Sequence, residues 1–255
     1  MKKIIFVFAF FLAFYSYSQS SVILAMVLEE DKEDSYLKME RDWQKVNEAA
    51  VAKGYIVQWS VWKRTPREGD DGWAEYFVII RSNAKQEKMA MSESDWKKLS
   101  YEVFKGKSKK STDKRLSNVG IVKEVRSRTY KIATTTGWRG LEWEIGDKAY
   151  FHYMTQKNDD FIAYETAVWK PIAQQRILDG YLKYWGISEL VDSNDVTKEL
   201  KSTSTHIAFN FPTKKLNEEA FKSPEDFLGK RAEEALLGSR EMMPAEELTL
   251  IYSTF

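Results

Sequence analysis

Residues 43–59 read WQKVNEAAVAKGYIVQW and residues 169–185 read WKPIAQQRILDGYLKYW, so Trp, Gly, Tyr and Trp recur at identical spacing. Each copy has the pattern of the end of a helix, a Gly stop and the start of a strand. A recurring unit of this kind is a piece of fold rather than a low-complexity tract. The sequence therefore predicts a tandem duplication within one chain.

The similarity extends upstream, because residues 34–40 (DSYLKME) match residues 159–165 (DDFIAYE). The spacing to the tryptophan changes, however: Glu40 precedes Trp43 by three residues, whereas Glu165 precedes Trp169 by four. The second helix therefore either contains one extra residue as a bulge or begins one residue earlier relative to its Trp. Pro171 is expected to kink the helix near that point.

The order of expected elements is the same in both halves. In the first half we expect strand 20–28, a helix from 34 to a stop at Gly54, strands 55–63 and 73–81, helix 93–105, a basic loop 105–114, a short helical stretch 116–123 and strand 125–134. In the second half we expect strand 148–155, helix 160–179, strands 181–190 and 204–211 around a loop 191–201, a helix from the Ser-Pro-Glu-Asp start at 223–226 to Gly238, and strand 247–254. Each half follows the β-α-β-β-α-β order of a ferredoxin-like unit. The predicted fold class is α+β, with one unit at 19–136, a connector at 137–147 and a second unit at 148–255. Because the connector is rich in Trp, we expect it to pack on the surface.

These features resemble the dimeric α/β-barrel superfamily, in which two ferredoxin-like units place their four-stranded sheets face to face with helices outside. The likeness rests on the duplicated W-x10-G-Y-x3-W pattern and on the element order, and it covers nearly all of the chain after residue 18. It is greatest to exported proteins of unassigned activity that carry two such units in one chain. The resemblance implies a pseudo-dimeric barrel within one chain. The duplication itself predicts a monomeric protein, because each unit already has a partner in the same chain for its open sheet face. It implies no particular reaction, since members include cofactor-independent monooxygenases, isomerases and haem enzymes, and no catalytic motif of theirs matches here.

The first 18 residues have the pattern of a secretory signal peptide: Lys2 and Lys3, an apolar run from 4 to 15, and a small-x-small site at 16–18. A membrane anchor needs about 20 apolar residues, more than this run provides. We therefore expect an exported protein, periplasmic or secreted, cleaved near Gln19 and free of the membrane afterwards. The chain contains no Cys, so packing and hydrogen bonds must provide its stability.

Composition excludes several kinds of function. The formal net charge is +1, and about −1 after loss of Lys2 and Lys3, which argues against nucleic acid as a partner. The basic loop 105–114 lacks interleaved aromatic residues and is interpreted as a solvated, mobile loop rather than a binding patch. No Gly-rich phosphate loop, G-x-S-x-G elbow or zinc-protease helix is present, and thiol chemistry is impossible. We predict no cofactor and no metal.

The repeated aromatic and acidic residues have two interpretations each. Trp43 and Trp169 could form an aromatic ligand cage, but their place on an apolar helical stripe favours core packing. Glu40 and Glu165 could act in acid–base chemistry, but helical Glu residues are usually solvated. Lys170 and Arg176 are interpreted as ordinary surface charges.

Strand parity in the second unit separates two sets of side chains. An apolar set comprises Phe151, Tyr153, Trp185, Ile187, Ile207, Phe209 and Phe211. A mixed set comprises Tyr150, His152, Met154, Tyr184, Gly186, Ser188, His206, Ala208 and Asn210. If the apolar set lies under the helices, the mixed set faces the interior between the two sheets, where the first unit adds Gln58, Ser60, Trp62 and Tyr76. Small and polar residues together are typical of a small-molecule pocket.

The predicted ligand-binding residues are therefore His152, His206, Tyr184, Ser188, Asn210, Gln58, Trp62 and Tyr76. The two histidines, the only ones in the chain, are expected to point into one cavity with Tyr184 and Asn210. They could bind a metal or haem or act as a base, but a third ligand is lacking, and a buried His hydrogen-bonded to Tyr or Asn is the simpler interpretation.

Two functions remain open. The protein is predicted to bind, or to transform, a small apolar or aromatic molecule between the two sheets. The alternative is a structural or interaction module of the cell envelope whose interior is filled by side chains. A tightly packed interior without a cavity near His206 would favour the second. Whether the protein is an enzyme is not decided by the sequence.

Overall fold

The computed structural model describes residues 19–70, 72–137, 143–215 and 227–254. The first half forms β1 (Gln19–Leu28), α1 (Glu33–Ala52), β2 (Gln58–Arg64), β3 (Tyr76–Asn83), α2 (Ala84–Lys88), α3 (Glu93–Val103), α4 (Lys109–Leu116) and β4 (Val122–Thr135). The second half forms β5 (Lys148–Gln156), α5 (Phe161–Tyr164), the π-helical turn η1 (Glu165–Trp169), α6 (Lys170–Leu178), β6 (Leu182–Ser193), α7 (Asp195–Glu199), β7 (His206–Pro212), α8 (Phe227–Gly238), β8 (Arg240–Met242) and β9 (Glu246–Ser253).

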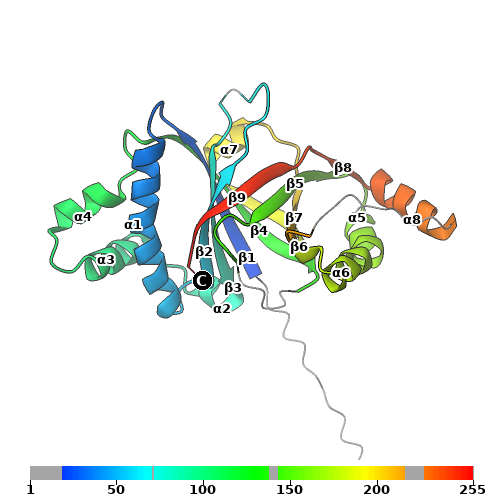
Figure 1. Cartoon of the computed structure of the whole chain (residues 1–255), viewed down its shortest axis with the longest axis horizontal. Coiled ribbons are helices and arrows are strands. Elements are labelled where there is room, and N and C mark those ends of the chain that lie inside the picture. The colour runs from blue at the N-terminus through cyan, green and yellow to red at the C-terminus, as the bar shows by residue number, and fades with distance from the viewer. Residues whose placement is uncertain (1–18, 71, 138–142, 216–226, 255) are drawn as a thin grey trace, which may run out of the picture.

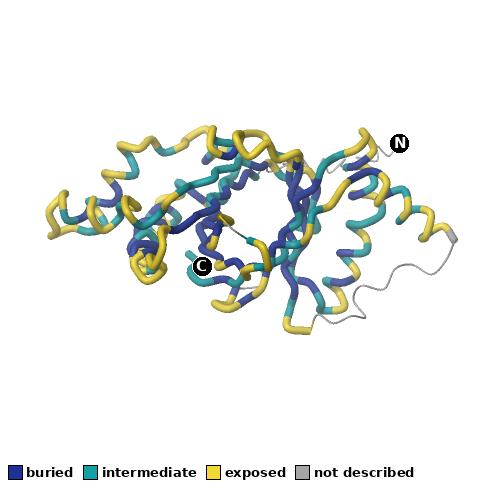
Figure 2. Tube along the Cα trace, turned by 90° about the horizontal axis from the view of Figure 1, so that it is seen from above, coloured by how far each residue is buried: buried dark blue, intermediate teal, exposed yellow. Residues whose placement is uncertain are grey.

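Eight of the strands close into an antiparallel barrel. The hydrogen-bonded order is β7-β6-β4-β1-β3-β2-β9-β5, and pairing between β5 and β7 closes the ring. The short strand β8 pairs with the end of β5 beyond β9. Seen from above, the strands form a ring of largely buried positions with the helices outside it (Figure 2). Closure leaves none of the eight strands with an unpaired long edge, which protects the sheet from edge-to-edge association.

Strand order is the same within each half. The first half contributes β4-β1-β3-β2, and the second contributes β9-β5-β7-β6, so in each half the order by sequence is fourth, first, third, second. The halves join at two antiparallel seams, β4 with β6 and β2 with β9. The two four-stranded sheets therefore form opposite walls of one continuous barrel, and their edge strands pair at the two seams.

Helices cover the barrel on two opposite sides. In Figure 1, α1, α3 and α4 lie on one side, and α5, α6 and α8 lie on the other. The expected stripe of α1 is present: Met39, Val46 and Ala50 are buried against the sheet, and Gly54, at φ 73°, ends the turn that follows the helix. Apolar side chains thus form three clusters, one inside the barrel and one under each helical layer.

The second repeated helix contains the extra residue as a π-bulge. The backbone N–H of Lys170 bonds to the carbonyl of Glu165, five residues earlier, and η1 spans the interval between Glu165 and Trp169. The bulge alternative of the two sequence interpretations is therefore the correct one. Pro171 lies in the first turn of α6, where its missing N–H is tolerated. Glu165 and Trp169, at the two ends of the bulge, both face the sheet.

Two local expectations are wrong. The basic stretch at 105–114 is not a loop throughout, because α4 begins at Lys109 and the Ser108 hydroxyl accepts a hydrogen bond from the N–H of Ser111. The helical stretch expected at 116–123 therefore lies seven residues, or about two turns, too late. A capping Ser outweighed the run of lysines that had suggested a solvated loop.

Part of the connector enters the barrel instead of packing on its surface. Trp143 is buried, with ring centroids 5.2 Å from Trp62 and 4.3 Å from Phe211. A large aromatic side chain at this place fills interior volume that the strands leave open. Residues 138–142, the signal peptide expected at 1–18 and the helix start expected at 223–226 lie outside the described residues.

Candidate functional site

The structure divides the predicted site residues among three places. Gln58, Trp62, Tyr184 and Ser188 lie together inside the barrel, as predicted. His152, His206 and Asn210 lie on the outer face of the second half's strands. Tyr76 lies on the outer face of the first half, where its ring contacts Tyr36 and its hydroxyl donates to Glu33. The predicted set is thus not a single cavity.

The error lies in the register between strands, not in the alternation within them. In β5 and β7, His152 pairs with Ala208 and Met154 with His206, so both imidazoles share one face, as expected. That face also carries Trp185 and Ile187, since β6 pairs Trp185 with Asn210 and Ile187 with Ala208.

The apolar residues of β5 and β7 point inward, where Phe151, Tyr153, Ile207, Phe209 and Phe211 fill the barrel with Tyr184. The sequence had placed Trp185 on the same face as this group. A shift of one residue in the pairing of β6 with β7 moves every side chain of β6 to the other face of the sheet. Because both faces of this sheet are buried, alternation between apolar and polar residues does not reveal which one points inward.

The part of the barrel interior that holds the predicted residues has little free space. The cavity beside Trp62, Tyr184 and Ser188 has a volume of about 30 Å³. That is room for a water molecule or two, not for the predicted ligand between the sheets. Interior aromatic rings pack edge to face, for example Phe151 against Phe209 at 4.8 Å. The interior is therefore packed at this place, whereas a pocket of about 400 Å³ lies beside Phe77 and Tyr153, further along the barrel.

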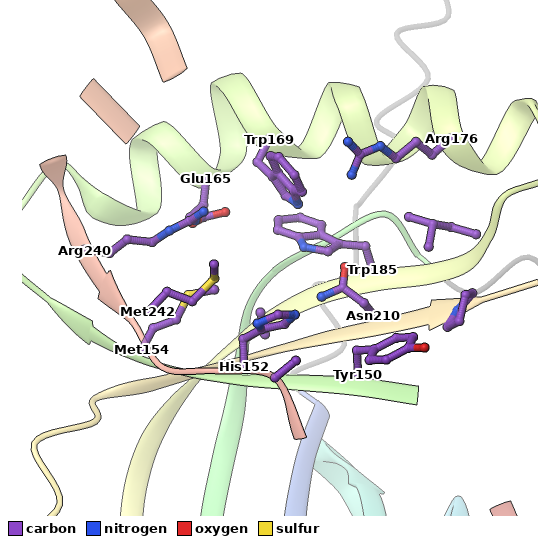
Figure 3. A pocket seen from close by; sticks show the side chains of 14 residues that line it. Tyr150, His152, Met154, Glu165, Trp169, Arg176, Trp185, Asn210, Arg240 and Met242 are labelled. Atoms are coloured by element: carbon purple, nitrogen blue, oxygen red, sulfur yellow. The ribbon is translucent and has the colours of Figure 1, made fainter. Parts of the chain in front are cut away.

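A cavity of about 400 Å³ lies on the opposite face of the same sheet, beneath α5, η1 and α6 (Figure 3). Its walls come from the helical layer, from β5, β6 and β7 and from the segment around β8. The lining residues are Tyr150, His152, Met154, Glu165, Trp169, Arg176, Leu182, Trp185, Ala208, Asn210, Pro212, Arg240, Met242 and Ala245. We call this cavity the C-terminal helix pocket. Its size and mostly apolar lining match those of small-molecule sites.

An ion pair lies at one end of the C-terminal helix pocket. The Arg240 guanidinium, from β8, contacts the Glu165 carboxylate, from η1, and both side chains are buried. Burial lowers the pKa of Arg240 to about 10, so the guanidinium remains charged at neutral pH. The two charges cancel, and this end of the pocket presents no net charge to a ligand.

His152 provides a polar group on the strand side of the pocket. Its Nδ1 atom is out of contact with solvent and has no hydrogen-bond partner among the described residues. Burial, and secondarily the charge of Arg240, lowers the pKa of His152, while the backbone of Met243 opposes the shift. The ring is therefore neutral at pH 7, and its Nδ1 atom can form a hydrogen bond with a ligand.

His206 has a different role from His152. It shares the outer face but is absent from the pocket lining; its ring packs on Phe161 at 4.8 Å, and its Nδ1 atom is 2.9 Å from the Thr205 hydroxyl. Burial lowers its pKa, and the charge of Glu189 opposes that shift. The prediction that both imidazoles open into one cavity with Tyr184 is wrong, because Tyr184 points inward and His206 is covered by α5.

Aromatic side chains form the middle of the pocket. Trp169 projects from the helical layer and Trp185 from the sheet, with Asn210 and Tyr150 nearby on the strands (Figure 3). Arg176 is buried rather than a surface charge, and its guanidinium lies 4.7 Å from the centroid of the Trp169 ring. An aromatic or apolar ligand body would contact these rings on entry.

Sequence reasoning missed Arg176 and Arg240 and interpreted Glu165 as solvated, although its side chain is 1% exposed. The only available signal was the spacing of Glu165 and Trp169, whose extra residue proved to be the π-bulge; such bulges are frequent at functional sites. Among the described residues, no cluster of three His, Cys, Asp or Glu side chains has metal-binding geometry, and no described helix is long and apolar enough to cross a membrane.

No family model matches the chain, and no curated protein matches its sequence. Solved structures do match. A candidate monooxygenase from Lactobacillus acidophilus has 12% sequence identity and a TM-score of 0.55, over 92% of this chain and 95% of its own. A candidate monooxygenase from Fusobacterium nucleatum has 11% identity and a TM-score of 0.53, over 94% of each chain. An anthrone oxidase-like protein has 14% identity and a TM-score of 0.49, over 94% of this chain and 93% of its own.

The two structures with TM-scores above 0.5 align with 92% and 94% of this chain, which forms a closed eight-stranded antiparallel barrel. The chain has the dimeric α+β barrel fold. At identities of 11–12% the likeness concerns the arrangement of strands and helices. A shared fold does not determine function, so the function of the C-terminal helix pocket depends on the chemistry of its own residues.

Proposed function

We propose that the protein binds one small, mostly apolar or aromatic molecule in the C-terminal helix pocket. The observation that carries the proposal is a cavity of about 400 Å³ that holds a buried, partnerless nitrogen of His152 among aromatic and apolar side chains. An unpaired buried polar atom is unfavourable in the empty protein and is satisfied when a ligand group bonds to it. The site is on the outer face of the sheet and not, as the sequence suggested, between the two sheets.

The chemistry of the lining defines the ligand class. The Glu165–Arg240 pair is already neutralised, and His152 is uncharged at neutral pH, so neither of these calls for an ionic ligand. The Arg176 guanidinium, the remaining charge of the lining, lies over the Trp169 ring. His152 and Asn210 can bond to a hydroxyl or carbonyl group, while Trp169 and Trp185 contact the apolar body. A phenol or a comparable hydroxylated aromatic compound satisfies both requirements.

A neutral imidazole can also remove a proton from a bound phenol. Two proteins that share the fold with TM-scores above 0.5 are described as candidate monooxygenases. The proposal therefore includes conversion, by this protein, of the aromatic compound that it binds. Mass spectrometry of small molecules and metals released from the protein, purified from its native compartment, would identify a natural ligand.

The binding proposal is tested by calorimetric titration with 2-naphthol and with naphthalene. Ala208 lines the pocket opposite His152, so Ala208→Leu should reduce the affinity for both compounds about tenfold or more. Ala163→Leu, on the exposed side of α5, is the matched control. His152→Leu should remove the preference for 2-naphthol over naphthalene. Equal affinities in the wild type and Ala208→Leu would refute this location.

We further propose that the barrel is an internal pseudo-dimer of two ferredoxin-like units, 19–136 and 148–255, and that the protein is a monomer. The repeated strand order and the repeated Trp-Gly-Tyr-Trp pattern support a tandem duplication. Export, with cleavage after residue 18, is also a proposal. It rests on the N-terminal sequence, and the mass of the protein recovered from culture medium or periplasm tests it.

A further inference from the structure

A second pocket, of about 420 Å³, lies between α1, α3 and the outer face of the first half's strands. We call it the N-terminal helix pocket. It is lined by Leu24, Met26, Met39, Glu40, Trp43, Asn47, Trp59, Val78, Ile80, Glu93, Trp96, Leu116, Asn118 and Val125. It occupies the place in the first half that the C-terminal helix pocket occupies in the second, since Glu40, Trp43 and Trp59 repeat Glu165, Trp169 and Trp185.

The two pockets differ in charge. Glu40 is 3% exposed, and among the described residues no cationic side chain forms an ion pair with it. The equivalent Glu165 has Arg240 as its partner. The lining of the N-terminal pocket contains no Lys, Arg or His, and its second carboxylate, Glu93, pairs with Lys97 at 2.7 Å. The pocket therefore has a buried acid whose counter-charge the described residues do not supply.

Neighbouring cations are engaged elsewhere. Lys45 and Arg115 both pair with Asp42, at 3.0 and 2.8 Å. Burial raises the pKa of Glu40 to about 7, while the Tyr36 hydroxyl acts in the opposite direction. The Oδ1 atom of Asn47, a buried acceptor in the same pocket, has no hydrogen-bond partner among the described residues. The carboxylate of Glu40 and the amide oxygen of Asn47 can both accept a hydrogen bond from a ligand.

Three indole rings surround this acid. Trp43 and Trp59 come from the repeated motif, and Trp96 comes from α3, with the Trp43 and Trp96 centroids 6.4 Å apart at 76°. The face of an indole attracts a cation more strongly than any other side-chain ring. A buried carboxylate also gains most from a cation that enters the same low-dielectric space.

From this juxtaposition we infer that the N-terminal helix pocket binds a small organic ammonium ion with an apolar body. The ammonium group pairs with Glu40 and donates to Asn47, and the apolar body packs against the tryptophans and against Met26, Val78 and Ile80. This second site accepts a different ligand class from the C-terminal pocket. It stands independently of the function proposed for that pocket.

The test compares 2-phenylethylammonium with 2-phenylethanol, which has nearly the same size and no charge. An alkylammonium stays protonated well above neutral pH, as Lys does with a pKa of about 10.4. In calorimetric titrations at pH 8, wild-type protein should prefer the ammonium about tenfold or more. Glu40→Gln keeps the shape and removes the charge, so it should abolish the preference and leave binding of the alcohol unchanged. Glu48→Gln, the same substitution on the exposed face of α1, is the matched control and should bind as the wild type does.

Three results would overturn the inference. They are no binding of the ammonium by wild-type protein, equal affinity for the two compounds, or a preference that persists in Glu40→Gln. A thermal melt of each variant accompanies the titrations. Because Glu40→Gln removes a buried charge without changing volume, the variant is expected to remain folded, and its titration is then decisive.

Discussion

Glu165 of η1 and Arg240 of β8 form an ion pair that is buried between the C-terminal helical layer and the edge of the barrel. The pair joins the π-bulge, which the spacing from Glu165 to Trp169 allowed as one of two alternatives, to the strand β8, which sequence reasoning did not foresee. Its first-half counterpart, Glu40, has no such partner among the described residues. Because of this difference at a repeated position, we expect different effects on stability from the two acids.

Arg240→Met should destabilise the protein by about 3–5 kcal/mol, because it leaves the Glu165 charge buried and uncompensated. The double variant Glu165→Leu with Arg240→Met should recover most of that loss, since it removes both charges together. Urea unfolding of the wild type, the two single variants and the double variant measures the coupling. Lys97→Met, which breaks the exposed pair with Glu93, serves as the control and should change stability by less than about 1 kcal/mol. Additive effects of the two single changes would contradict a buried pair.

Glu40 should make stability fall as pH rises. Its pKa is about 7 in the folded protein, against 4.5 for an unperturbed Glu. Between these values the folded state holds a proton that the unfolded state has lost, so the free energy of unfolding decreases with pH. Below about pH 4.5 the residue has no such effect, and above about pH 7 the loss is complete, at about 3 kcal/mol.

Glu40→Gln cannot ionise and should therefore be more stable than the wild type at pH 8 but not at pH 4. Urea unfolding of both proteins across this range isolates the contribution, because all other titrating groups are shared. A stability difference that does not vary with pH would show that Glu40 ionises normally in the folded state.

Gly186 provides space for the ring of Tyr184 inside the barrel. A Cβ atom at this position would lie 2.5 Å from the Tyr184 hydroxyl oxygen and 3.0 Å from Cζ. Because this part of the interior has little free volume, the ring cannot move away without disturbing its neighbours, and Gly186→Ala should cost about 1–3 kcal/mol. In Gly238→Ala, where no atom lies within 4 Å of the added methyl group, stability should be nearly unchanged. Thermal or urea unfolding compares the two, and equal stabilities would mean that the ring is not held against Gly186.

The first half of the chain should not behave as a soluble monomer when it is expressed alone as residues 19–140. In the full chain, β2 pairs with β9 and β4 pairs with β6, so this fragment has two unpaired edges and an open apolar face. Such edges recruit other strands. Size-exclusion chromatography with light scattering should show dimers or larger species for the fragment and a monomer for the chain from residue 19. A stable monomeric fragment would argue against the pseudo-dimer.

Much of the fold was predictable because local chemistry determines it. The helix stop at Gly54, the apolar stripe of α1 and the alternation along β5, β6 and β7 depend on residues close together in sequence. The π-bulge was also anticipated as one of two alternatives, since the spacing from Glu165 to Trp169 contains one residue more than that from Glu40 to Trp43.

The sequence by itself determined the two repeated halves, the order of their elements and the pairs of side chains that share a face within each strand. Tertiary structure alone decided the register between β6 and its neighbours, and it also decided which face of β5 and β7 points inward, so that His152 and Asn210 lie outside. The physical reason is that this sheet is buried on both sides, so burial favours apolar residues on either face and the pattern contains no sign of direction. The sequence also left the partners of Glu40 and Glu165 undetermined. Glu165 pairs with Arg240, which is about 75 residues away in sequence, whereas Glu40 has no ion-pair partner among the described residues, and nothing near either acid in the sequence distinguishes the two cases.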